Sequence, residues 1–220
     1  QNYFIDQSQY ADSFLIKALG LSKLISFDKS DYENCDVVLN FEKNFDFDEK
    51  FDIFFDGGSL PHIYNIPKTL ENIVKLTKID GKIIHTVAFN NFQGFGLYQI
   101  SPELLFSFYS KKNGFSDTSI YLVSNLENNY WYKIKDLDEG ERYHFNSNDQ
   151  LSAYIVTTKK KEVISFEVDQ KFFLSKNITK KKSYNRFIIN TYLYFKIVIS
   201  ALFMNFFLRF DKKLNREKID

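Results

Sequence analysis

Residues that could carry out chemistry gather in one short stretch of the chain. Asp56, Gly57 and Gly58 follow directly on an apolar run. Two glycines after a strand let the backbone turn sharply and let a ligand come close. His62 follows shortly afterwards, and an imidazole can take a proton from an alcohol near neutral pH. The pattern predicts a polar binding site that contains a candidate general base.

The elements predicted around this stretch are a strand, a helix and a second strand. The apolar run Phe51–Phe55 is typical of a strand buried in a parallel sheet. Pro67 suits the first turn of a helix, which Asp80-Gly81 would close. The strand that begins at Gly81 carries His85, which we expect in the core or in a supporting role. A βαβ unit implies a parallel sheet with ligands beyond the carboxyl ends of its strands.

Polar residues also follow other predicted strands. Leu24–Asp28 is predicted as a strand that ends in an acid, and Val37–Leu39 as a short third strand. In dinucleotide-type sheets, an acid at such a position accepts hydrogen bonds from both ribose hydroxyls. Neutral donors and acceptors, suited to a polar substrate, follow the strand after Gly81: Asn90, Asn91, Tyr98 and Gln99.

Three sequence blocks resemble a bacterial group of class I S-adenosylmethionine-dependent methyltransferases. Residues 56–65, DGGSLPHIYN, are similar to the group's D-G-G-T-L-E-H-[VI]-F-N. Residues 90–104, NNFQGFGLYQISPEL, are similar to N-N-x-x-G-H-G-F-Y-Q-F-S-P-E-L, and residues 26–33 to S-x-D-x-S-D-Y-E. The blocks occur in the group's order and spacing, which makes them a specific signal together.

The resemblance implies S-adenosylmethionine as cofactor, S-adenosylhomocysteine as product, and a small-molecule or glycan acceptor. We therefore expect O-methylation of a bacterial surface carbohydrate or of its capsule phosphoramidate modification. The catalytic residues implied are His62, Tyr98 and Asn91, and the acceptor-binding residues are Asn90 and Gln99. The cofactor-binding residues implied are Asp6, Gln7, Asp28, Lys29, Leu39, Asn40, Asp56, Gly57 and Gly58. No metal site is expected.

Four features depart from the group's pattern. The first predicted turn, Asp6–Gln9, has no glycine, and Val38 stands where the group has Asp. Pro61 replaces a Glu and Phe95 replaces a His. These departures leave open a degenerate, non-catalytic partner subunit. A membrane-associated scaffold that uses the C-terminal segment is a third alternative.

The composition places limits on the class of protein. The chain has 220 residues, enough for one domain with an appendage, and its net charge of +1 gives no electrostatic case for nucleic acid. A single cysteine, Cys35, excludes an internal disulfide and favours a reducing, cytoplasmic compartment. The sequence shows no signal peptide.

Alternating strands and helices predict an α/β domain with a doubly wound, mostly parallel sheet. The resemblance implies a Rossmann-like fold with antiparallel strands at one end. We place this domain at 1–165, a polar insertion at 125–150, and a C-terminal helical extension at 166–220.

The apolar segment Tyr184–Phe210 is interrupted by polar residues such as Lys196. It predicts an amphipathic helix that packs on the domain or on a partner in an oligomer, or a helix on the membrane surface; a spanning helix is a third alternative.

Overall fold

The structure is a computed structural model that describes residues 15–17, 20–31, 34–124, 131–143 and 147–171. The chain divides into two units, Gln1–Leu174 and Ser175–Asp220, and all described residues belong to the first. The predictions for Asp6, Gln7 and the segment 184–210 lie outside the described residues. Within the described ranges, no helix combines the length and the apolar character needed to cross a membrane.

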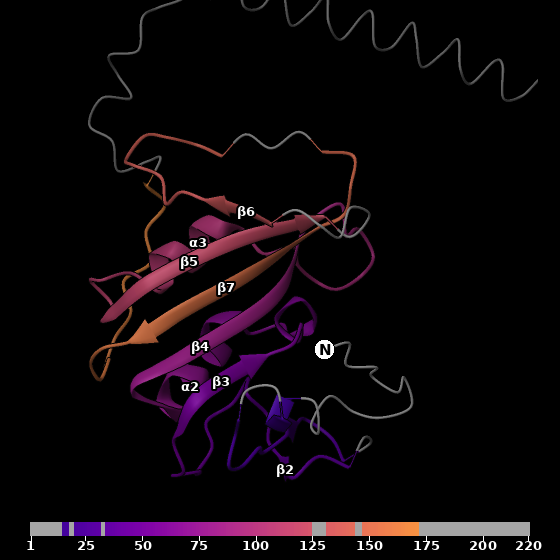
Figure 1. Cartoon of the computed structure of the whole chain (residues 1–220), viewed down its shortest axis with the longest axis vertical. Coiled ribbons are helices and arrows are strands. Elements are labelled where there is room, and N and C mark those ends of the chain that lie inside the picture. The colour runs from indigo at the N-terminus through magenta and orange to yellow at the C-terminus, as the bar shows by residue number, and fades with distance from the viewer. Residues whose placement is uncertain (1–14, 18–19, 32–33, 125–130, 144–146, 172–220) are drawn as a thin grey trace, which may run out of the picture. The chain divides into compact units, whose positions relative to one another are not determined.

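Five strands form one mixed sheet in the order β3-β4-β7-β5-β6 (Figure 1). Their bounds are β3 Phe51–Asp56, β4 Thr77–Asn90, β5 Phe115–Ser124, β6 Trp131–Ile134 and β7 Leu151–Lys159. Only β3 and β4 pair in parallel in this sheet, because β7 pairs antiparallel with both β4 and β5, and β6 pairs antiparallel with β5.

The prediction of a mostly parallel sheet is therefore wrong for these strands. The physical reason is that β7 returns between β4 and β5, which run in the same direction, and so separates them with a reversed strand. A mixed sheet with helices packed on it is in keeping with the predicted α/β class.

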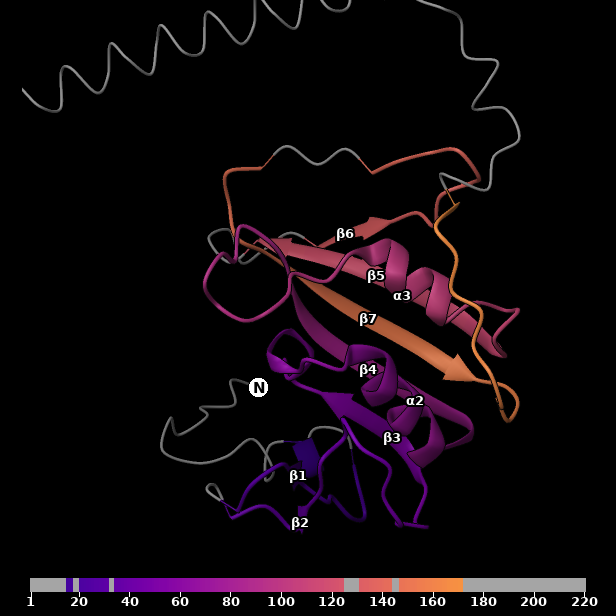
Figure 2. The same ribbon diagram turned by 180° about the vertical axis from the view of Figure 1, so that it is seen from behind.

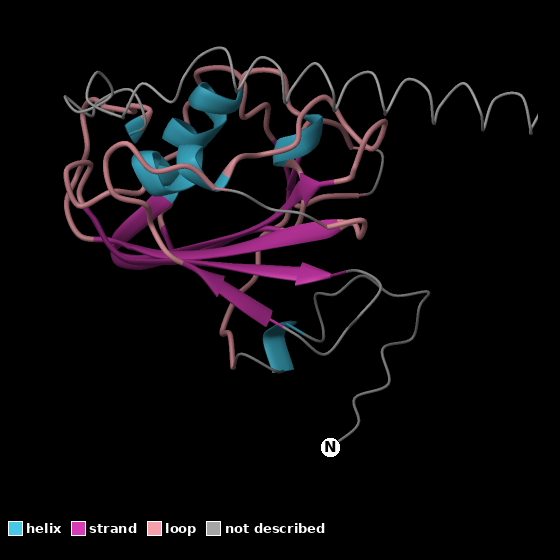
Figure 3. Ribbon diagram, turned by 90° about the horizontal axis from the view of Figure 1, so that it is seen from above, coloured by secondary structure: helices cyan, strands magenta, loops and turns pink. Residues whose placement is uncertain are grey.

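The main helices lie on one face of this sheet (Figure 3). They are α2, Ile66–Leu76, and α3, Pro102–Phe108, and a short 3-10 turn, η1, covers Leu60–His62. Residues 15–17 are also helical. Apolar side chains of α2 and α3 meet those of β4, β5 and β7 to form the core, which includes Leu70, Ile73, Leu105, Ile83, Ile120 and Ile155.

Helix α2 begins where the sequence predicts and ends earlier. The Asn65 side chain accepts a hydrogen bond from the Lys68 N–H, and Pro67 lies in the first turn. The helix ends at Leu76, because the chain enters β4 at Thr77. Asp80, with φ of 64°, lies at a shift in the β3–β4 register, so Asp80-Gly81 forms an irregularity inside β4 and does not close the helix.

Two short strands lie beside β3 (Figure 2). They are β1, Phe27–Asp28, and β2, Val37–Val38, which pair in parallel. The Phe27 ring packs against the rings of Phe51 and Phe54 of β3, at centroid distances of 5.7 and 6.5 Å. Aromatic packing thus holds β1 next to the larger sheet.

The segment after β7 returns across α3. The Phe166 ring stacks on Phe108 with 4.3 Å between centroids. The side-chain NH2 group of the buried Asn113 lies within hydrogen-bond distance of three carbonyls, those of Ser107, Phe108 and Glu167. Its side-chain oxygen accepts from the Glu167 N–H. Asn113 therefore closes α3 and fixes this segment with one side chain.

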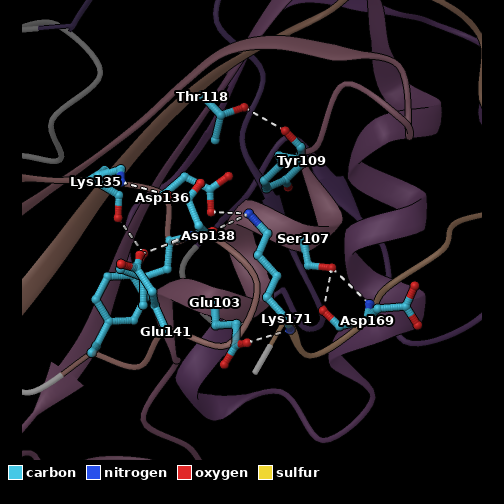
Figure 4. A network of polar contacts seen from close by, with 12 residues as sticks. Glu103, Ser107, Tyr109, Thr118, Lys135, Asp136, Asp138, Glu141, Asp169 and Lys171 are labelled. Carbon is cyan, nitrogen blue, oxygen red and sulfur yellow. Dashed lines mark hydrogen bonds and ion pairs between the residues drawn. The ribbon is translucent and has the colours of Figure 1, made fainter. Parts of the chain in front are cut away.

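Lys171 joins the same segment to α3 and to the loop after β6 (Figure 4). Its backbone N–H donates to Glu103 and its ammonium group pairs with Asp136 at 2.6 Å. Ser107 and Asp169 exchange two further hydrogen bonds nearby. The chain thus stays packed on the first unit beyond residue 165, where we expected the domain to end.

Candidate functional site

Two of the sequence blocks pack on each other at the carboxyl ends of β3 and β4. The N–H groups of Leu97 and Tyr98 both donate to the carbonyl of Pro61, at 2.7 and 3.1 Å. A Cβ atom at Gly96 would lie 2.7 Å from the same carbonyl oxygen, so only glycine permits this approach. The tertiary structure therefore brings the DGGSLPHIYN and NNFQGFGLYQISPEL blocks together.

His62 lies exposed at this junction. It is the last residue of η1, and its ring lies 5.0 Å from the ring of Phe95, centroid to centroid. Phe95 also packs against Phe92 at 5.3 Å. Phe95 thus gives His62 an aromatic packing contact.

The side chains of Asn91 and Gln99 hold the loop that follows β4. The Asn91 amide donates to the carbonyls of Ser147 and Asp149, each at 2.8 Å, and the residue has φ of 60°. The Gln99 side-chain oxygen accepts from the Phe92 N–H at 2.9 Å. These contacts shape the loop, and the action of Asn91 and Gln99 on the acceptor stays a prediction.

Tyr98 and Asn90 lie at the same edge. The Tyr98 hydroxyl donates to the carbonyl of Tyr64 at 3.3 Å and its side chain is exposed. Asn90 is the last residue of β4, opposite Leu151 of β7. Both remain placed where a ligand beyond the strand ends could reach them.

The Asp56 side chain turns into the domain. Its Oδ1 accepts from the N–H groups of Gly58 and Ser59, at 3.2 and 2.7 Å, and its Oδ2 lies 2.9 Å from Nδ1 of His85. The other ring nitrogen of His85 lies 2.6 Å from the hydroxyl of Tyr109. All three side chains are buried, with exposed fractions of 6% for Asp56, 0% for His85 and 1% for Tyr109. The prediction that His85 lies in the core is therefore confirmed.

Two pKa shifts describe the charge in this buried group. Burial raises the pKa of Asp56, but the hydrogen bond with His85, together with those from the two backbone N–H groups, outweighs it and leaves the pKa below its ordinary value. Burial, assisted by the charge of Asp56, raises the pKa of Tyr109 well above its ordinary value. At neutral pH, Asp56 is therefore ionised and Tyr109 keeps its proton.

The sequence analysis missed the part that Tyr109 plays. No motif marks it, and it follows the last residue of α3 in an aromatic stretch. The signal that could have pointed to this group is the polar His85 inside a strand of otherwise apolar inward positions, since a buried histidine requires partners.

The predicted cofactor residues near β1 form a second group. Asp28 is exposed, and its Oδ1 accepts from the N–H and the hydroxyl of Ser30, at 2.7 and 3.2 Å. The Leu39 N–H donates to the Asp28 carbonyl at 2.7 Å, which fixes the end of β2 beside the end of β1. Asn40 accepts from the N–H of Glu42 at 2.9 Å.

Glu42 connects this group to the first motif block. Its carboxylate pairs with Lys29 at 3.2 Å and accepts from the Asn65 N–H, also at 3.2 Å. The Asn65 N–H and Lys29 lower the pKa of Glu42. Glu42 thereby connects the group of Asp28, Lys29, Leu39 and Asn40 to the start of α2. The sequence did not suggest this role for Glu42.

Among the described residues, no group of three or more His, Cys, Asp or Glu side chains could hold a metal ion. The sequence matches no protein-family model and no curated protein. The assignment of function therefore depends on the residues and their arrangement.

Proposed function

We propose that this protein is an S-adenosylmethionine-dependent methyltransferase that acts on a hydroxyl group of a bacterial surface carbohydrate or of its phosphoramidate modification. The observation that carries the proposal is the contact between the two motif blocks through the Pro61 carbonyl, at the carboxyl ends of β3 and β4. Ligands of such sheets bind beyond the carboxyl ends of parallel strands.

The residues at this edge suit a nucleoside cofactor. An exposed carboxylate, Asp28, ends β1 and can accept hydrogen bonds from two ribose hydroxyls. Leu39 is held beside it and offers apolar contact for a base. Gly58 has φ of 122°, a conformation that favours glycine, so the turn after β3 carries no side chain at this position.

The sheet supports a methyltransferase-like fold in one further respect. The resemblance implies an antiparallel end to an otherwise parallel sheet. In this protein β3, β4 and β5 run in one direction, and the two reversed strands, β7 and β6, both lie in the part of the sheet beyond β4.

The chemistry proposed for this chain is proton removal and positioning. When bound, S-adenosylmethionine supplies the methyl group. An imidazole nitrogen of the exposed His62 takes the proton of the acceptor hydroxyl. Tyr98 and Asn90 orient the acceptor, and the contacts of Asn91 and Gln99 fix the loop that carries Tyr98. The transfer needs in-line geometry more than a strong base, so positioning dominates.

A second candidate is a non-catalytic partner subunit with the same fold. The observation that favours it is the contact of His62 with the Phe95 ring, because a polar neighbour that could orient the imidazole is replaced there by a hydrocarbon surface.

The test is calorimetric titration of the full chain with S-adenosylhomocysteine. Asp28→Asn keeps an oxygen for the Ser30 contacts and removes the charge, so we expect an affinity lower by about 10- to 150-fold, the loss typical of charge-assisted hydrogen bonds. Asp46→Asn is the matched control, because Asp46 is also an exposed carboxylate and lies outside the predicted cofactor residues.

A wild-type protein that does not bind S-adenosylhomocysteine would exclude the methyltransferase proposal. Equal affinities for wild type and Asp28→Asn would remove Asp28 from the site. Binding without methyl transfer to any member of a panel of surface glycans would favour the partner subunit.

A further inference from the structure

The turn Gly57–Ser59 is tied to the interior of the domain by an unbroken chain of polar contacts. The chain runs from the Gly58 and Ser59 N–H groups to Asp56, from Asp56 to His85, and from His85 to Tyr109. An Asp that caps a turn at the surface needs no further partner. Here the carboxylate is buried together with an imidazole and a phenol, all three within the apolar core.

The placement of protons gives every member of this chain a partner. The phenol of Tyr109 keeps its proton, so we assign the His85 tautomer in which Nε2 accepts that proton in a hydrogen bond. Nδ1 of His85 then carries the proton that it donates to Asp56. The Asp56 carboxylate accepts three hydrogen bonds, two of them from the turn. Removal of any one donor leaves a buried polar atom without its partner. The Asp56 carboxylate is then held in its orientation by fewer contacts.

The three side chains come from three different elements. Asp56 ends β3, His85 lies in β4, and Tyr109 follows α3. The Tyr109 carbonyl in turn accepts from the Thr118 hydroxyl of β5 at 2.7 Å (Figure 4). One exposed turn is therefore connected through the core to α3 and β5.

We propose that Asp56, His85 and Tyr109 are positioning residues that hold the backbone of Gly57–Ser59 in the conformation that receives the cofactor. This inference rests on the proposed function for the identity of the ligand. It replaces the prediction that the Asp56 side chain contacts the cofactor: Asp56 acts from inside the domain, and the backbone of the turn makes the contact.

The experiment measures amide hydrogen exchange by NMR in the full-length chain. Tyr109→Phe removes only the phenol oxygen. We expect the amides of Gly58 and Ser59 to exchange about tenfold faster, the effect typical of losing one buried hydrogen bond, while amides in β7 such as Ile155 keep their rates. Tyr143→Phe is the matched control, because it also removes a phenol hydrogen bond, the one to the Lys135 carbonyl, in a different part of the domain.

Unchanged exchange at Gly58 and Ser59 in Tyr109→Phe would overturn the inference. A uniform increase that includes Ile155 would also overturn it, because it would show a loss of global stability only. If Tyr109→Phe does not fold, Asp56→Asn serves instead, since it keeps the size of the side chain and removes its charge; the same local increase is expected.

Titration with S-adenosylhomocysteine gives the second readout. If the wild type binds S-adenosylhomocysteine, we expect Tyr109→Phe to bind it at least about threefold more weakly than the wild type, and Tyr143→Phe to bind it as well as the wild type. Equal affinities in all three proteins would contradict the proposal that Tyr109 positions the turn for the cofactor. If the wild type does not bind, the proposed function fails, and the exchange rates alone decide whether these residues position the turn.

Discussion

Lys159 is a fully buried lysine whose ammonium group lies at the carboxyl end of α2. It donates to the carbonyls of Val74 and Thr77, at 3.0 and 2.9 Å, and pairs with Glu162 at 2.8 Å. The last carbonyls of a helix lack partners within the helix and carry partial negative charge. A cation from β7 therefore completes the end of α2.

We predict that Lys159→Met destabilises the protein by about 2–4 kcal/mol, because two buried carbonyls lose their donor. The measurement is urea unfolding. Lys160→Met is the control, since Lys160 forms an exposed pair with Asp80 and such pairs contribute little. Equal losses in the two variants would contradict the stabilising role of Lys159.

At the scale of elements, the site depends on the contact between η1 and the loop 91–101. This loop reaches η1 through backbone groups, and Gly96 leaves no room for a Cβ atom there. The carbonyl that accepts both hydrogen bonds belongs to Pro61, so this contact is made by the backbone and does not depend on the Pro61 side chain.

We predict that Gly96→Ala separates the loop from η1. The new Cβ atom would lie 2.7 Å from the Pro61 oxygen and 3.0 Å from its carbonyl carbon, both backbone atoms that move only with η1 itself. We expect a loss of about 1–3 kcal/mol in stability, as for other overpacked sites, and faster exchange of the Leu97 and Tyr98 amides. Gln93→Ala, an exposed position in the same loop, should change neither quantity. Protected amides at residues 97 and 98 in Gly96→Ala would show that the loop does not depend on this approach.

At the scale of the whole molecule, the buried group around Asp56 links stability to pH. The pKa of Tyr109 is higher in the folded than in the unfolded protein, so its contribution to stability is fully present below the unfolded value of about 10 and is lost as pH rises above it. The pKa of Asp56 is lowered, so its contribution is present above the unfolded value of about 3.9 and is lost as pH falls below it.

We predict that the wild type loses stability more steeply than Tyr109→Phe as the pH rises above about 10. The unfolded wild type can release the Tyr109 proton there and the folded wild type cannot, whereas the variant has no such proton. Urea midpoints measured from neutral to alkaline pH would show it. Tyr64→Phe is the control, because its ring is largely exposed and its curve should follow that of the wild type. Parallel curves for wild type and Tyr109→Phe would contradict the buried, protonated phenol.

The sequence by itself determined the features that depend on neighbouring residues. The strand at Phe51–Asp56, the start of α2 at Asn65 and Pro67, and the strand that carries His85 follow from local periodicity and from the conformations that Gly, Pro and Asn favour. The motif blocks also marked the two loops that meet at the strand ends, because residues that follow adjacent parallel strands share one edge.

Only the tertiary structure decided the features that depend on distant partners. Helix α2 ends at Leu76 with the help of Lys159, and β7 inserts between β4 and β5, although its own sequence does not specify its neighbours. The Asp56 side chain turns inward because His85 and Tyr109 are buried behind it. A local pattern records which side chains are polar, but the partner that satisfies a buried polar group is fixed only when segments far apart in the chain pack together.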